Sequence, residues 1–258
     1  MRRLLPLLLA ALSACALPAR AGNLADVEVY DRSSGAMLPL YRHEGRLYVA
    51  GEPRHEYELR IRNYSGARLL AVGSVDGVNV LSGETAAPDQ DGYVLDGYGS
   101  LAIAGWRKSL QRVAAFYFTA LPDSYAARTG RPDDVGVIGV ALFRERVACC
   151  ARVQDLSREL SRDQPRAVPA PMLSTPAEAG SAAKAAPEAM DRLGTGHGRS
   201  EYSAAYETTF ERNSAVPDEV ISIFYDSRRK LIAQGIVAEP RLAQRSPNPF
   251  PNGFVPDP

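Results

Sequence analysis

The feature that most constrains the fold is an alternation of apolar and polar residues repeated many times between residues 22 and 153. In "EYELRIRN", Tyr57, Leu59 and Ile61 alternate with charged residues. Successive side chains of a strand point to opposite faces, so this segment predicts a half-buried antiparallel strand. Similar segments, separated by Gly, Ser and Asp turns, are "DVEVYD", "RLYVA", "RLLAVGSV", "SLAIAGW", "VAAFYFT" and "VGVIGVALF". No long helical pattern separates them, which indicates an all-β fold: an antiparallel β-sandwich of immunoglobulin-like architecture.

The pattern changes after this region. Residues 154–192 are dominated by Ala, Pro, Ser and Glu, and too few apolar side chains remain to offset the entropy of ordering, so we expect a disordered, flexible linker. Order resumes at 193–238, where "VISIFY" predicts a strand, 231–237 its β-hairpin partner and 206–212 a third strand. About 45 residues are too few for an independent core, so this C-terminal β module should dock on the sandwich and extend it. Residues 239–258 are Pro-rich and predict a disordered tail.

Residues 1–21 have the pattern of an export signal peptide: basic residues, an apolar run and then small residues. Two processing sites compete. Cleavage after Ala21 gives a protein that is periplasmic or secreted, and this is the preferred prediction. Cleavage before Cys15, in a segment that resembles a lipobox, gives a lipid-anchored outer-membrane lipoprotein with Cys15 acylated.

Charge and cysteine content limit the partners. The sequence has 30 Lys and Arg against 30 Asp and Glu, so nothing favours nucleic acid, and membrane contact is expected only through a lipid anchor at Cys15. The adjacent Cys149 and Cys150 do not make a disulfide scaffold. No cofactor is predicted. The expected partner is an unidentified envelope protein or ligand.

One segment could carry catalysis. "GTGHG" places His197 between glycines, and a hydrolase would use His197 as general base, Ser200 or Ser203 as nucleophile and Asp226 to orient the imidazole. The same glycine pattern could cradle a phosphate, but no Lys-Ser/Thr pair follows it. The hydrolase is therefore the alternative hypothesis.

Two other segments could bind ligands. "GWRKS" contains the only tryptophan, Trp106, beside Arg107 and Lys108, and could form a binding patch or a core-edge ring beside two solvated cations. His197 of "GTGHG" is a separate candidate binding residue. Asp89 and Asp91 match the start of a calcium loop. The fifth and twelfth positions of that loop hold Tyr93 and Ser100, so metal binding is the alternative to a simple turn.

The segments "SVDGVNVLSG", "GYVL", "GWRKS", "VGVIGVALF", "LGTGHG" and "YDSR" together resemble a family of uncharacterised exported proteobacterial proteins. That resemblance implies export and assigns no role to any residue. The sequence as a whole therefore predicts an exported cell-envelope β-sandwich that acts as a binding or structural/accessory module.

Overall fold

The computed structural model describes residues 21–147 and 192–239. Nearly all of the predicted signal peptide, linker and tail lie outside these ranges, as do Cys15, Cys149 and Cys150. No helix in the described ranges is long and apolar enough to cross a membrane.

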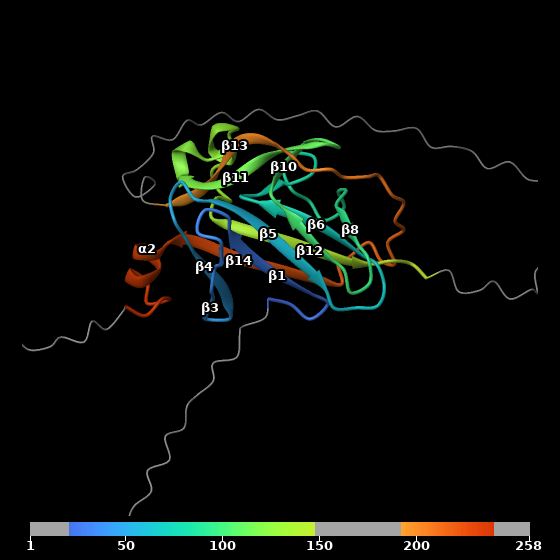
Figure 1. The fold of residues 1–258 in the computed structure, drawn as a ribbon. Coiled ribbons are helices and arrows are strands. Elements are labelled where there is room, and N and C mark those ends of the chain that lie inside the picture. The colour runs from blue at the N-terminus through green and yellow to red at the C-terminus, as the bar shows by residue number, and fades with distance from the viewer. Residues whose placement is uncertain (1–20, 148–191, 240–258) are drawn as a thin grey trace, which may run out of the picture.

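Two seven-stranded sheets pack face to face (Figure 1). The first contains β1 (Ala25–Asp31), β2 (Ala36–Met37), β5 (Glu56–Asn63), β9 (Ser100–Ile103), β10 (Gly105–Ser109), β11 (Arg112–Ala120) and β13 (Leu193–Tyr202). The second contains β3 (Leu40–His43), β4 (Arg46–Gly51), β6 (Leu69–Val75), β7 (Val78–Asn79), β8 (Tyr93–Leu95), β12 (Val137–Arg144) and β14 (Glu219–Ser227). The helical elements of the described residues are short: η1 (Leu121–Asp123), α1 (Tyr125–Arg128) and α2 (Arg228–Ala233). The predicted all-β sandwich is confirmed.

The alternation seen in the sequence separates core from surface. Tyr57, Leu59 and Ile61 of β5 are fully buried between the sheets, whereas the charged residues between them face outward. Tyr57 stacks on Phe116 and Phe118 of β11, with ring centroids 5.3 and 4.3 Å apart. Stacked rings of this kind add to the energy of burial, and they fix β11 against β5.

The two C-terminal strands enter different sheets. β13 pairs antiparallel with β11 in the first sheet. β14 lies inside the second sheet, parallel to β4 on one side and antiparallel to β12 on the other. Residues 193–227 therefore complete both layers of the sandwich.

The prediction of a C-terminal β-hairpin is wrong. Leu231, expected in its second strand, lies in helix α2 and is buried. Ser227 caps this helix by accepting a hydrogen bond from the Lys230 amide, as an N-cap serine does. Residues 206–212 do not form a strand either: only Arg212 makes an isolated bridge, to Glu145.

Candidate functional site

Residues 203–212, here called the strap, connect the edge of the first sheet to the outer face of the second. Figure 1 shows the strap as the orange segment that leaves β13 and descends toward β14. At its start, the Ser203 and Ala205 amides donate to the carbonyls of Gln111 and Leu110, at 2.9 and 2.7 Å.

Arg107 fastens the start of the strap. Its Nη1 donates to the Ser203 carbonyl at 2.5 Å, and its Nε donates to the Tyr93 hydroxyl at 3.0 Å. Arg107, predicted as a binding residue, thus holds two chain segments together. Lys108, predicted beside it, is exposed.

The far end of the strap is fastened by a second arginine and a ring. Arg212 donates to the carbonyls of Pro88 and Gln90, and its guanidinium lies 4.4 Å from the centroid of the Phe143 ring. Phe210 packs on a small apolar cluster on the outer face of the second sheet, made of Leu70, Val72, Ala141 and Phe143. Both ends of the strap are therefore anchored.

A groove of about 650 Å³ lies between the strap and the sheets. Its apolar lining includes Leu70, Leu81, Val94, Leu101, Leu110 and Phe210, and its polar lining includes Asp91, Tyr93, Arg107, Glu207 and Arg212. Tyr206, in the middle of the strap, also lines the groove and is 90% exposed. The groove offers apolar walls, an exposed ring and two carboxylates.

The structure does not form the binding patch predicted around Trp106. This side chain is only 3% exposed; its ring packs edge-on against Phe116 and lies 4.8 Å from the ring of Tyr125. Its Nε1 is buried and has no acceptor among the described residues. The ring fills the end of the core because an indole buries more apolar area there than it would at the surface.

His197 lies at the surface above this ring. The His197 and Trp106 rings are nearly parallel, with centroids 6.3 Å apart, and the Tyr125 ring is 5.4 Å from His197. Asp226 is elsewhere: it accepts a hydrogen bond from the Leu193 amide at 3.2 Å and pairs with Lys230 at 3.5 Å. Four residues of strand, roughly 13 Å, separate Leu193 from His197.

The predicted hydrolase arrangement is therefore not formed. His197 and Asp226 do not meet, Ser203 is held by Arg107, and Ser200 lies opposite Ala114 in the β11–β13 ladder. "GTGHG" is part of strand β13, not a loop, so it cannot wrap a phosphate.

The aspartates of the predicted calcium turn are both exposed. Their loop is held by amide side chains: Asn79 donates to the Gln90 side-chain oxygen at 2.9 Å, and that oxygen also accepts from the Ala87 amide. Asp89 and Asp91 find no third ligand in the described ranges, where no group of three His, Cys, Asp or Glu residues could hold a metal ion.

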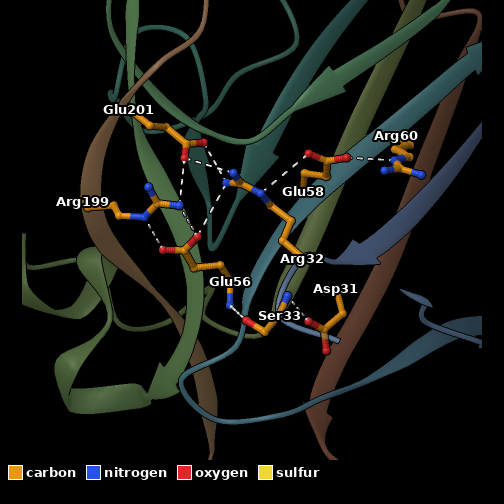
Figure 2. A network of polar contacts seen from close by, with 8 residues as sticks. All are labelled: Asp31, Arg32, Ser33, Glu56, Glu58, Arg60, Arg199 and Glu201. Carbon is orange, nitrogen blue, oxygen red and sulfur yellow. Dashed lines mark hydrogen bonds and ion pairs between the residues drawn. The ribbon is translucent and has the colours of Figure 1, made fainter. Parts of the chain in front are cut away.

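A network of ion pairs crosses the outer face of the first sheet (Figure 2). Arg32 binds both oxygens of Glu201 at 2.7 and 3.0 Å, and Arg199 binds both oxygens of Glu56 at 2.8 and 2.9 Å. The hydrogen bonds that Arg199 donates lower the pKa of Glu56, and the hydrogen bonds that Arg32 donates to Glu201 raise the pKa of Arg32. The network joins β5 and the end of β1 to β13, and its charges satisfy one another.

A His–Asp pair that the sequence did not predict lies beside this network. His55 Nδ1 lies 2.7 Å from Oδ2 of Asp31, which is 3% exposed. Burial by itself would raise the pKa of Asp31, but the bond to His55 and the amides of Ser33 and Ser34 lower it. A histidine beside a polar turn gives no local signal of this partner, which lies 24 residues earlier.

Fold and groove together define the class: an all-β sandwich protein with a strap-covered surface groove. No family model, curated protein or solved structure matches the chain.

Proposed function

We propose that this chain is an exported cell-envelope protein that binds a ligand in the strap groove, as a binding or accessory module. The N-terminal export pattern supports a location in the cell envelope. The groove supports ligand binding, because its volume of about 650 Å³ is within the range of small-molecule sites.

The lining indicates the chemistry of the ligand. Leu101, Leu110 and Phe210 provide apolar contact, and Tyr206 provides an exposed ring. Asp91 and Glu207 make no side-chain hydrogen bond or ion pair with the described residues, so their oxygens can accept from a ligand. We therefore expect a molecule with an apolar body and hydrogen-bond donors.

The strap tyrosine gives the sharpest test. Tyr206→Ala removes an exposed ring from the groove, whereas Tyr202→Ala removes a ring that is 75% exposed and lies outside it. Loss of one well-placed ring costs about 1–2 kcal/mol, so Tyr206→Ala should weaken binding about five- to thirtyfold. Tyr202→Ala should leave binding unchanged.

Fluorescence titration with 1-N-phenylnaphthylamine, a neutral aromatic probe with one N–H donor, measures this. Native mass spectrometry of protein purified from the envelope should also find a bound small molecule that Tyr206→Ala loses. Equal probe affinity in both variants and wild type, with no bound molecule, would refute the groove as the binding site.

A further inference from the structure

A second groove, of about 450 Å³, opens at the end of the sandwich where helix α2 lies, at the left of Figure 1. Its lining comes from β4, the loop that enters β12, the start of β13, and β14 with α2. It shares no lining residue with the strap groove. Its volume is within the range of small-molecule sites, so it is a separate candidate for binding.

The base of this groove is apolar. Phe224 of β14 lies in register with Tyr48 of β4 on one side and with Val137 of β12 on the other. The rings of Phe224 and Tyr48 are 5.7 Å apart. All three side chains are half-buried and line the groove. This apolar row, Tyr48, Phe224 and Val137, offers a ligand an apolar surface three strands wide.

A buried carboxylate fixes the neighbouring wall. Asp76, in the turn between β6 and β7, is fully buried. It accepts hydrogen bonds from the Gly136 amide at 2.9 Å, the Tyr225 hydroxyl at 2.5 Å and the Thr195 amide at 2.7 Å. Gly136 and Tyr225 also line the groove. The bonds join the start of β12 to β13 and β14, so this wall is formed before any ligand arrives, which lowers the cost of binding.

The β4 side of the groove carries an arginine without an acid partner. Arg46 is exposed, and its guanidinium carbon lies 5.4 Å from the centroid of the Phe224 ring. Its side chain makes no hydrogen bond or ion pair with the described residues. A guanidinium presents a fork of donors that matches a carboxylate. Arg46 can therefore bind an anionic group that lies over the apolar row.

The opposite side, where the chain enters β12, carries two acids. Asp133 and Asp134 are exposed, line the groove and make no side-chain hydrogen bond or ion pair with the described residues. Arg192 lies on the same side and donates to the Val135 carbonyl at 2.9 Å. One arginine against two aspartates leaves this side negative. A cationic group is therefore favoured here.

The two sides are too far apart for a single amino acid. β4 and β12 flank β14, so two strand spacings, roughly 9–10 Å, separate them. A free amino acid carries its ammonium and carboxylate groups on one carbon atom and cannot reach both sides. A peptide of two or three residues spans roughly 7–11 Å when fully extended. Between the two sides, Lys230 and Asp226 pair with each other at 3.5 Å.

We propose that this groove binds a short peptide with free ends, two or three residues long. The C-terminal carboxylate binds Arg46, and the N-terminal ammonium binds Asp133 and Asp134. Apolar side chains of the peptide lie on the apolar row. The site thus recognises the two ends of the peptide by charge and its body by apolar contact.

Calorimetric titration of the full chain with dileucine tests the proposal. The free peptide should bind, and N-acetylation or C-terminal amidation should each weaken binding about tenfold, because each removes a charge from a charge-assisted hydrogen bond. Leucine alone should bind more weakly than dileucine, since it cannot reach both sides.

Two variants assign the ends of the peptide. Arg46→Gln should weaken dileucine binding about tenfold and abolish the effect of amidation, because the partner of the carboxylate is gone. The double variant Asp133→Asn, Asp134→Asn should abolish the effect of acetylation instead. General damage to the groove would not produce these separate losses. Arg112→Gln, at an exposed arginine outside the groove, is the matched control and should bind like wild type.

Three results would overturn the proposal. The first is no binding of either dileucine or trileucine at millimolar concentration. The second is an amidation effect that persists in Arg46→Gln. The third is displacement of 1-N-phenylnaphthylamine by dileucine, which would place the peptide in the strap groove. Conversely, failure of the phenylnaphthylamine titration leaves the dileucine result intact, because the two grooves share no lining residue.

Discussion

A single ring explains one glycine of "GTGHG". Gly196 of β13 lies opposite Tyr117 of β11, and a Cβ atom at position 196 would lie 2.1 Å from Cζ of that ring. Gly196→Ala should therefore destabilise the fold by about 1–3 kcal/mol, since the ring or the strand must move. Urea unfolding measures this. Gly66→Ala, where the new Cβ would be in ordinary contact at 3.4 Å, should change stability by about 0.5 kcal/mol or less. Equal stability of the two variants would contradict this role for Gly196.

The sequence alone could not reveal this role at the scale of one residue. Glycines between polar residues predict a loop unless the aromatic partner is known, and Tyr117 is separated from Gly196 by 79 positions in sequence. Asp76 and Asp31 were missed for the same reason: the first has its donors at positions 136, 195 and 225, and the second pairs with His55. Local patterns predicted the burial of Tyr57, Leu59 and Ile61, because alternation is a property of one segment.

At the scale of elements, β14 is the strand on which the second sheet depends. Ile223 is fully buried and lies in register with Leu47 of β4 and Ile138 of β12. Ile223→Ala should cost about 2–5 kcal/mol of unfolding free energy, because it leaves a cavity between two strands. Val220→Ala on the same strand removes a side chain that is 62% exposed and should cost about 0.5 kcal/mol or less. Chemical denaturation of both variants checks the difference; similar losses would show that β14 is not a central strand.

The sequence predicted β14 correctly but not its neighbours. Period-two alternation in "VISIFY" identifies a strand without specifying what it pairs with. The expected hairpin partner became helix α2, since Ser227 supplies an N-cap and the following residues are good helix formers. Parallel pairing with β4 has no local signature, because it depends on the route of the chain through the whole sandwich.

At the scale of the molecule, the fold is completed by segments from both ends of the described chain. Residues 21–147 alone would lack β13 and β14, which would leave β4 and β12 of the second sheet without the strand between them. Exposed strand edges of this kind promote aggregation. The buried Asp76 carboxylate would also lose the Thr195 amide and the Tyr225 hydroxyl, which both donate to it, and Arg32 would lose Glu201.

A split chain tests this dependence. The fragment 21–147, expressed alone, should show no cooperative thermal transition, whereas co-expression with 192–239 should restore one and yield a one-to-one complex. The second fragment is needed because burial of Ile221, Ile223 and Tyr225 contributes about 1.5–3 kcal/mol per side chain. For the three side chains together, this contribution is comparable with the whole stability of a typical domain. Calorimetry of the fragment, the complex and the full chain gives the comparison. A fragment 21–147 that unfolds cooperatively at the midpoint of the full chain would mean that the first sheet and the remaining strands of the second are stable without β14.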